Sequence, residues 1–455
     1  MAYYNWKSYK LTVDPINFLK ALAGRRNCFF LDSSLAFNSL GRYSFLGVDP
    51  FYILRTKNQL PFKKLRELLD SYRINAPKNM PPFLGGAVGY LGYDLGVLLE
   101  KKIKRSNLRD LEIPGASFCF YNTILIIDNL KRTLDIFAIG FPEKKYHLQK
   151  SLVESNLKKL ENLLSQVSCY KPGAKDCTNK NKTVKLKSNF RKEDYLQAVK
   201  KAKLYIKNGD IYQVNLSQRF HAESDSSDIE IYQRLRKLSP SFFSAYFDAG
   251  GFMILSSSPE RFLKLEDGIV STRPMKGTRP RGTTGRRDSL LRNQLLASSK
   301  DRAELTMIVD LERNDLGRVC KYDSIKVNKL RELEEYNTVF QTTATVSGSL
   351  HKNKDRIDLL RASFPGGSIT GCPKLRAMEI IEELEPDRRC IYTGSLGYLS
   401  FSGNMDFNVL IRTILKRGNN LYFSVGGGIV ADSQPEAEYR ETLVKAKAMI
   451  GAING

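Results

Sequence analysis

A glutamate and a lysine on either side of an expected hairpin form the first pair of residues whose types and spacing suggest chemistry. We expect one strand at 252–258 and a return strand at 269–272, joined by a turn at Asp267. A hairpin centred there would place Glu260 and Lys276 almost opposite each other, offset by about two residues or roughly 7 Å. A carboxylic acid and an amine would then face one small site. The alternative is a surface ion pair, which usually contributes little, and the spacing alone favours that alternative.

Acidic residues occur at helical spacing in two later segments. Residues 298–301, Ser-Ser-Lys-Asp, resemble a capping box that opens a helix containing Glu304. Pro435 suits the first turn of a helix that carries Glu438 and Glu441. Carboxylates from two helices could hold Mg²⁺, which prefers oxygen ligands and keeps several waters. Taken separately, each helix is better explained by ordinary pairs, such as Glu441 with the lysine four residues later.

Two glycine-rich segments and one isolated arginine suggest anion binding. The glycines at 426–428 directly follow an expected apolar strand, where backbone amides could approach an anion; a bulge or a tight turn is the alternative. Residues 364–374 form a second glycine-rich turn that leads into a helix, whose start favours anions. Arg412 is a lone charge in the apolar stretch 409–414, so we expect a carboxylate beside it.

The elements that must position these residues suggest an α+β fold. The chain has 455 residues, of which 42% are hydrophobic and 26% charged, as in globular proteins with a large core. Helical patterns at 147–166 and 195–206 and many short strands mix without regular alternation, which favours α+β over a parallel sheet. The polar stretch 167–188 is expected to be a linker between an N-terminal region, 1–166, and a second region, 189–455.

Several classes of protein are excluded by what the sequence lacks. No apolar run approaches the roughly 20 residues of a membrane-spanning helix, and no signal peptide is visible, so we expect a cytoplasmic enzyme with no membrane partner. Seven scattered cysteines without zinc-ligand spacing indicate reduced thiols and no structural metal. The net charge of +24 invites a nucleic-acid interpretation. No recognised nucleic-acid module accompanies it, so we expect no nucleic-acid partner. With three histidines and no nucleophile elbow, a histidine-assisted triad is also disfavoured.

Nine segments, taken together, resemble the family of chorismate-utilising enzymes, which includes the anthranilate, aminodeoxychorismate, isochorismate and salicylate synthases. They occur in family order, at 209–218, 257–262, 272–278, 300–304, 308–315, 364–374, 392–398, 411–413 and 426–433. The resemblance implies an α+β fold in which two antiparallel sheets pack face to face with helices outside. The site would lie in the cleft.

A weaker likeness covers 30–34, 41–47 and 83–90. In relatives this part helps to bind tryptophan, as an inhibitor or as a buried structural ligand. The resemblance therefore implies a tryptophan ligand near Ser34, Arg42 and Tyr43. One departure from the family is Asp32, which stands where Glu is usual.

Two positions separate the family's chemistries. Members that add water carry a lysine base where this chain has Gln213, and a neutral amide cannot deprotonate water, so ammonia fits better. Anthranilate synthases carry a small residue at the position of Lys276, whereas the members that aminate C4 carry lysine in a Pro-Ile-Lys-Gly-Thr motif. Here residues 274–278 read Pro-Met-Lys-Gly-Thr. The resemblance thus implies amination of chorismate at C4 through a covalent Lys276 adduct, with Glu260 as general acid.

The resemblance also implies roles for the other candidate residues. Mg²⁺ would hold the ring carboxylate through Glu304 and Glu441, with Glu438 and Asp301 in support. The substrate would contact a further set: Gln213, Thr370, Tyr392, Arg412, Gly426, Gly427, Gly428, Lys445 and Gln341. Many relatives have histidine at Gln341, and an amide cannot carry a proton.

Lys276 must be neutral to attack, so we expect a lowered pKa caused by burial or by nearby cations such as Arg273 and Arg279. Ammonia would come from a separate glutamine amidotransferase subunit. Two alternatives stay open, namely an anthranilate synthase component and a non-catalytic homologue that binds tryptophan.

Overall fold

Two large antiparallel sheets dominate the computed structural model, which describes residues 2–35, 40–77, 79–100, 102–103, 111–168, 184–336 and 339–455. Twelve described strands form the larger sheet, in the order β1 (Tyr4–Lys10), β8 (Thr133–Ile139), β7 (Thr123–Asp128), β3 (Tyr43–Gly47), β2 (Phe29–Asp32), β11 (Phe243–Asp248), β12 (Met253–Ser258), β21 (Thr413–Arg417), β22 (Asn420–Ile429), β10 (Gln213–Glu223) and β18 (Gly371–Cys372), with β9 (Lys187–Ser188) beside β10. Ten form the smaller sheet, in the order β15 (Met275–Pro280), β17 (Val339–Ser349), β14 (Ile269–Arg273), β13 (Arg261–Glu266), β20 (Met405–Val409), β19 (Ser395–Ser400), β5 (Gly86–Leu91), β6 (Ala116–Tyr121) and β4 (Tyr52–Thr56), with β16 (Lys326–Glu335) beside β17.

The inner faces of the two sheets share one apolar core. Leu216, Phe247 and Ile254 of the larger sheet join Leu263 and Phe407 of the smaller sheet in a single buried cluster. A second cluster lies on the other face of the larger sheet, beneath the helices. The expected α+β architecture, with sheets packed face to face and helices outside, is confirmed.

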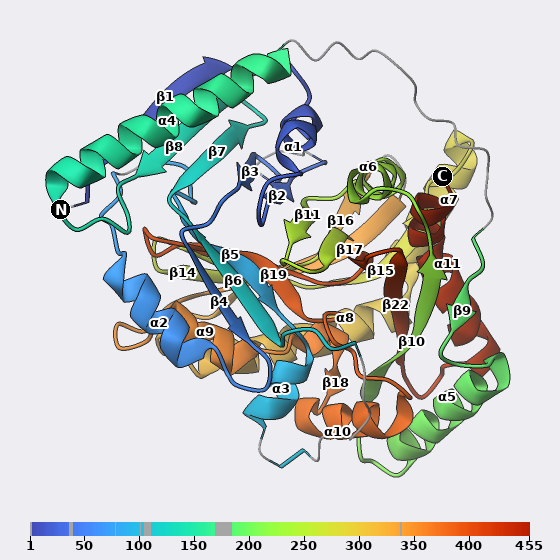
Figure 1. The fold of residues 1–455 in the computed structure, drawn as a ribbon. Helices are drawn as coiled ribbons and strands as arrows, with labels where there is room; N and C mark the ends of the chain where they lie inside the picture. The colour runs from blue at the N-terminus through green and yellow to red at the C-terminus, as the bar shows by residue number, and fades with distance from the viewer. Residues whose placement is uncertain are drawn as a thin grey trace.

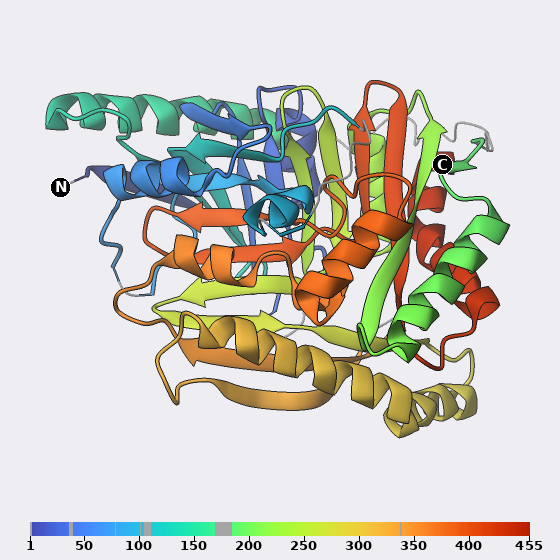
Figure 2. The same cartoon turned by 90° about the horizontal axis from the view of Figure 1, so that it is seen from below.

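Helices cover the outer faces (Figures 1 and 2). Along the larger sheet, α4 packs on β8 and β1, α6 on β12, and α11 on β22. Along the smaller sheet, α8 packs on β15, β17 and β16. The helices are α1 (Ile16–Leu22), α2 (Phe62–Ser71), α3 (Asp94–Leu99), α4 (Tyr146–Ser168), α5 (Lys192–Lys207), α6 (Asp228–Leu238), α7 (Gly285–Ala297), α8 (Ser299–Gly317), α9 (Arg356–Ser363), α10 (Lys374–Leu384) and α11 (Pro435–Asn454), with a 3₁₀ turn at Gly367–Ile369.

Strands from both halves of the chain take part in both sheets. In the larger sheet β2 pairs with β11, and in the smaller sheet β5 pairs with β19. Most of the expected linker, 169–183, lies outside the described residues. The boundary at 167–188 stays a prediction, and the shared sheets show that the two halves bury a common core.

The local signals at helix ends are largely confirmed. The Ser298 hydroxyl accepts a hydrogen bond from the Asp301 amide at the start of α8, and Pro435 opens α11. Gly209 follows α5 with a positive φ of 79°, a conformation that glycine adopts readily. These two helices, α8 and α11, carry the acidic residues considered below.

The hairpin expected at 252–272 is wrong in its first strand. Met253–Ser258 is β12 of the larger sheet, and the hairpin partner of β14 is β13, which begins at Arg261 in the smaller sheet. Pro259 and Glu260 therefore carry the chain from one sheet to the other. An alternating pattern reports strands but cannot report that two successive strands belong to different sheets.

Candidate functional site

Two chain crossings between the sheets meet side by side and place the first site residues. One crossing joins β12 to β13 through Glu260, and the other joins β20 to β21 through Arg412. The Val409 amide donates to the Glu260 carbonyl at 3.0 Å, and the Ser257 amide donates to the Arg412 carbonyl at 3.1 Å. Glu260 and Arg412 are thus held on adjoining backbones at the place where the two sheets exchange strands.

Glu260 and Lys276 share contacts with one turn. The Lys276 Nζ donates to the Ser368 carbonyl at 3.3 Å, and the Glu260 carboxyl accepts hydrogen bonds from the Ser368 side chain and the Met275 amide. The charges of Glu260 and Lys276 also act on each other. The expectation that acid and amine share a site is supported, although β15 and the 366–369 turn bring them together rather than a hairpin.

The environment shifts both groups toward their neutral forms. Burial raises the pKa of Glu260 to about 7, against the opposing effects of Ser368 and the Lys276 charge. Burial also lowers the pKa of Lys276, against the charges of Glu304 and Glu260, and Lys445 lowers it further. A protonated acid beside an unprotonated amine is the combination that nucleophilic attack with leaving-group protonation requires.

The two arginines expected to depress the Lys276 pKa are engaged elsewhere. Arg273 pairs with Glu334, and the Arg279 guanidinium lies 3.1 Å from the Asp301 carboxylate. Burial is the largest cause of the shift, and Lys445 is the cation that adds to it. Lys445 sits four residues beyond Glu441 on α11, so the cation comes from a distant helix rather than from the motif around Lys276.

The four predicted metal ligands lie on two helices that face the same region. The Lys300 ammonium is 4.0 Å from a Glu304 oxygen and 3.8 Å from a Glu438 oxygen, so it bridges α8 and α11. Glu441 pairs with Lys445 at 2.7 Å. Asp301 contacts Arg279 instead. In the described ranges no three acidic, cysteine or histidine side chains already form a metal-binding group.

The donor set nevertheless fits a hard cation. Burial raises the pKa of Glu304, against the Lys276 and Lys300 charges, and the carboxylates of Asp301 and Glu441 raise it further. A bound cation would relieve that repulsion. Carboxylate oxygens are the ligands that Mg²⁺ takes, and Mg²⁺ needs only one or two of them because it retains water.

Strand β22 brings its three glycines against other site residues. A Cβ atom on Gly426 would lie 3.0 Å from the Tyr392 hydroxyl, and one on Gly427 would lie 3.2 Å from a Glu438 oxygen. One on Gly428 would lie 2.4 Å from the Gln213 side-chain nitrogen. A side chain at any of the three would fill the space, so glycine is needed for close approach.

The glycines lie within a strand and not after it, which corrects the expectation from the sequence. Residues 426–428 pair with β10 on one edge, whereas β21 pairs with β22 only as far as Phe423. On the opposite edge, the pairing of β22 with β21 has therefore ended before the glycines begin. Backbone amides on such an edge can donate to an anion.

Gln213 has a buried side-chain amide for which the described residues provide no partner. It is 1% exposed, and within the described part of the chain neither its Oε1 nor its Nε2 has a hydrogen-bond partner. Buried polar atoms are normally satisfied, so this side chain suits a ligand. Thr370, by contrast, uses its hydroxyl locally to donate to the Gly366 carbonyl at 3.0 Å. Gln341 donates to the Met275 sulfur at 3.2 Å, one residue from Lys276.

Arg412 contacts a hydroxyl, and no carboxylate pairs with it within the described ranges. Its guanidinium lies 3.3 Å from the Ser239 hydroxyl, and burial lowers its pKa. No ion pair to Arg412 occurs among the described residues, so the protein carboxylate expected from the sequence is not found there. A carboxylate supplied by a ligand would complete the guanidinium's hydrogen bonding.

Two contacting residues were not singled out by sequence reasoning. Ser368 contacts both Glu260 and Lys276, and its only signal was its place inside the glycine-rich segment 364–374. Lys300 bridges the acidic helices, and its signal was its position next to Asp301. Neither residue type by itself predicts such a role, because each residue acts through contacts between segments that are distant in the sequence.

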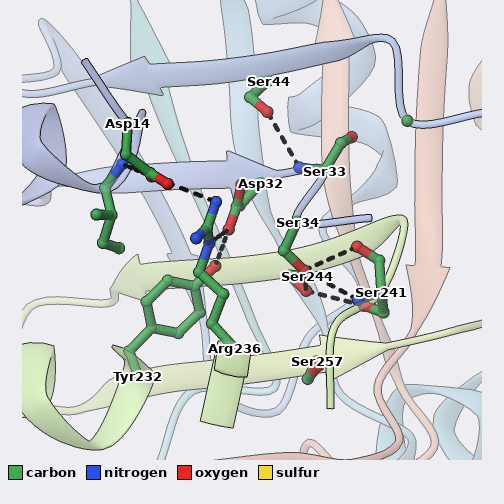
Figure 3. A network of polar contacts seen from close by, with 12 residues as sticks. Asp14, Asp32, Ser33, Ser34, Ser44, Tyr232, Arg236, Ser241, Ser244 and Ser257 are labelled. Atoms are coloured by element: carbon green, nitrogen blue, oxygen red, sulfur yellow. Dashed lines mark hydrogen bonds and ion pairs between the residues drawn. The ribbon is translucent and has the colours of Figure 1, made fainter. Parts of the chain in front are cut away.

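A second cavity, of about 260 Å³, lies between β2, β3 and β11 on one side and β13, β19 and β20 on the other. Arg42 and Tyr43 line it, and the Arg42 guanidinium stacks on the Tyr43 ring and pairs with Asp128. Ser34 follows the lining residue Ser33, and its hydroxyl contacts that of Ser244, another lining residue, at 3.1 Å (Figure 3).

Asp32 also borders the second cavity. Its carboxylate accepts from Arg236 at 2.6 Å and from the Tyr232 hydroxyl at 3.1 Å (Figure 3). Its other oxygen, Oδ1, has no hydrogen-bond partner among the described residues. The cavity therefore combines aromatic walls with one unsatisfied buried acceptor.

Among the helices of the described ranges, none is both long and apolar enough to cross a bilayer.

Comparison with known proteins matches most of the chain to one family. The sequence profile of the chorismate binding enzymes matches residues 26–451. The chain is 38% identical over 463 aligned residues to anthranilate synthase component 1 of Aquifex aeolicus, covering 97% of this chain and 92% of that protein. It is 36% identical to aminodeoxychorismate synthase component 1 of Bacillus subtilis, covering 96% and 93%. The crystal structure of anthranilate synthase component I from Streptococcus pneumoniae superposes with a TM-score of 0.77 at 30% identity, covering 97% of this chain and 99% of that one.

Proposed function

Since the chain belongs to the chorismate binding enzyme family, we propose that it aminates chorismate at C4, using ammonia and a covalent adduct on Lys276. The product would be 4-amino-4-deoxychorismate. The observation that carries this proposal is the enclosed Lys276 amine beside the Glu260 carboxyl, with Ser368 contacting both. An amine in this setting is a nucleophile next to its acid.

The reaction would proceed in two displacements. The neutral Lys276 nitrogen attacks C2 of chorismate, the ring double bond shifts, and the C4 hydroxyl leaves as water with the proton donated by Glu260. Ammonia then attacks C4, the double bond shifts back, and the C2–nitrogen bond to Lys276 breaks. The Lys276 amine is regenerated, and the proton lost by the entering nitrogen restores Glu260.

Several residues would orient the substrate. The Arg412 guanidinium, whose one side-chain hydrogen-bond partner among the described residues is the Ser239 hydroxyl, would bind one carboxylate. The amides of the β22 glycines and the Tyr392 hydroxyl beside Gly426 would bind another. Gln213, whose amide has no partner among the described residues, would contact the reacting face and hold the incoming ammonia.

Mg²⁺ would be held by Glu304 and Glu441, with Glu438 and Asp301 in support, and would neutralise the ring carboxylate when bound. The residues of the chain contribute to that site independently of the ion. Lys300 lies within 4.0 Å of Glu304 and 3.8 Å of Glu438, so it partly neutralises the carboxylates before any ion enters. Gly427 leaves the space that the Glu438 and Glu441 carboxylates face.

Anthranilate synthesis is the second candidate. The similarity to proteins named anthranilate synthase component 1 favours it. That reaction places the amine at C2 and releases the enolpyruvyl side chain as pyruvate. The Lys276 amine argues against it, because a side-chain nucleophile directed at C2 would occupy the carbon that ammonia must attack.

Ammonia would be supplied by a separate glutamine amidotransferase subunit. The relatives named above are each called component 1 of a synthase, which supports a second component for this chain. Ammonium salts should replace that subunit in vitro, since free ammonia is itself the nucleophile.

Product analysis tests the proposal. The purified chain is incubated with chorismate, Mg²⁺ and an ammonium salt at mildly alkaline pH, and the products are separated by mass. We expect a 4-amino product that keeps its enolpyruvyl group and is absent with Lys276→Ala. Lys329→Ala, which removes an exposed lysine on β16 of the same sheet, should behave like the parent. Anthranilate and pyruvate from the parent would refute C4 amination.

The second cavity supports a tryptophan ligand. Its volume of about 260 Å³ and its aromatic walls suit an indole, and the Asp32 Oδ1 atom, which has no partner in the described part of the chain, suits an ammonium group. Calorimetric titration with L-tryptophan should show binding that Tyr43→Ala weakens. Absence of heat with the parent chain would contradict this proposal without bearing on the amination.

A further inference from the structure

Glu312 is a carboxyl on the buried face of α8, where its neighbours are apolar. It is 2% exposed and lies among Leu305, Ile308, Val309 and Leu316. Burying a carboxyl is costly unless hydrogen bonds or a counter-charge offset the loss of water. The Oε2 atom of Glu312 has no hydrogen-bond partner in the described part of the chain. Stability alone would therefore favour an apolar residue at this position.

The charges around Glu312 do not neutralise it. Asp315, one turn further along α8, pairs with Lys374 at 2.5 Å and with Arg318 at 2.6 Å. Burial, together with the Asp315 charge, raises the pKa of Glu312, against the effect of the Lys374 charge. The surroundings therefore favour the neutral form of this side chain.

The carboxyl of Glu312 reaches the turn that contacts both reacting groups. The Gly367 amide hydrogen-bonds to this carboxyl, and a Cβ atom on Gly367 would lie 3.5 Å from its Oε1. The next residue, Ser368, donates to Glu260 through its side chain and accepts from Lys276 through its carbonyl. The charge of Glu260 acts on Glu312 as well.

We propose that Glu312 is a positioning residue of this site. By accepting a hydrogen bond from the Gly367 amide, it fixes the turn in which Ser368 positions the Glu260 carboxyl and the Lys276 amine relative to each other. It touches neither substrate nor Lys276 and acts through the turn. Glycines at 366 and 367 allow the turn to approach α8 and β13 closely, since a side chain at 367 would lie 2.3 Å from Leu311. Because the same glycines have no side chains that could restrain the turn, contacts from outside the turn must hold it in place.

Substitution of Glu312 separates positioning from a purely structural role. Glu312→Leu keeps the volume but removes the acceptor, and Glu312→Gln keeps an acceptor oxygen for Gly367. The readout is steady-state consumption of chorismate with ammonium, together with the melting temperature. For the leucine variant we expect kcat to fall by about 10-fold, the equivalent of one lost buried hydrogen bond, with KM within about 2-fold. Its melting temperature should equal or exceed that of the parent, because an unsatisfied buried carboxyl is gone.

The glutamine variant should recover most of kcat. Asp310→Asn, on the exposed face of the same helix, serves as control and should change neither quantity. Parental kcat in the leucine variant, or a glutamine variant no better than the leucine variant, would overturn the inference. If leucine prevents folding, Glu312→Met provides the same loss of acceptor in a more adaptable side chain.

This inference rests on the proposed chorismate site, but different measurements test the role of Glu312 and the proposed C4 amination. The identity of the product tests C4 amination. The ratio of chorismate consumption rates between variants tests Glu312, whichever amine is formed.

Discussion

Replacing Glu260 with glutamine should raise stability at neutral pH while removing the acid. The side chain is 5% exposed, and burial raises the pKa of Glu260 from 4.5 to about 7. A folded state with a raised carboxyl pKa retains its proton where the unfolded chain has lost it. The associated stability is therefore complete below pH 4.5 and lost progressively up to about pH 7.

The size of the effect follows from that window. Each pH unit between 4.5 and 7 removes about 1.4 kcal/mol from the free energy of unfolding, or about 3 kcal/mol in all. Glu260→Gln does not titrate, so it should escape this loss. Relative to the parent, the variant should gain about 3 kcal/mol between pH 5 and pH 8, and kcat should fall by about 10²- to 10⁴-fold through loss of the acid.

Reversible urea unfolding of both proteins at pH 5, 6, 7 and 8 measures the difference, and steady-state assays measure kcat. Glu67→Gln, which removes a half-exposed carboxylate on α2, is the matched control. The difference in free energy of unfolding between this variant and the parent should be the same at all four pH values. If the difference in free energy of unfolding between Glu260→Gln and the parent did not change with pH, the reasoning would be refuted, since Glu260 would not be desolvated in the folded state. A variant with parental kcat would show that another group protonates the leaving hydroxyl.

Three further substitutions test other parts of the site. Arg412→Gln should raise KM for chorismate by about 10- to 100-fold with a smaller change in kcat, because the buried guanidinium is assigned to a substrate carboxylate; an unchanged KM would place that carboxylate elsewhere. Gly427→Ala would put a methyl group 3.2 Å from Glu438 and should raise the Mg²⁺ concentration for half-maximal rate, whereas Gly24→Ala, with no atom within 4 Å of the new Cβ, should not. Lys276→Met should abolish turnover and unfold at a higher temperature at pH 7. Because the pKa of Lys276 is lowered in the folded state, the parent loses stability as pH falls toward that pKa. Melting temperatures measured from pH 7 to pH 10 should therefore show a difference between Lys276→Met and the parent that becomes smaller as pH rises.

The sequence predicted which residues share the site better than it predicted how they meet. Glu260 and Lys276 were expected on one hairpin, but Pro259 carries the chain between sheets and Lys276 lies on β15 beside β17. Strand alternation records which face a side chain occupies and not which sheet the strand joins. Although β13 and β14 do form a hairpin within that segment, β15 and the turn at Ser368 bring the two side chains to the same region.

The contacts that sequence reasoning missed depend on backbone atoms or on distant helices. Ser368 acts through its carbonyl as well as its hydroxyl, and any residue type supplies a carbonyl. Lys445, and not the neighbouring arginines, adds to the depression of the Lys276 pKa, because α11 returns over β22. Helix caps such as Ser298 were predictable, since capping depends on a few adjacent residues.

The burial that favours the neutral forms of the site's ionisable groups also reduces the stability of the fold. Lys276, Glu260 and Glu312 each occupy an enclosed position that opposes their charged forms, so each is more easily neutral than in water. Three desolvated ionisable groups in one region lower the free energy of unfolding. The surrounding sheets must supply that difference through the apolar core they share. The chain crosses between the two sheets at Glu260 and Arg412, so the backbone of these crossings carries the carboxyl proposed as the acid and the guanidinium proposed to bind a substrate carboxylate.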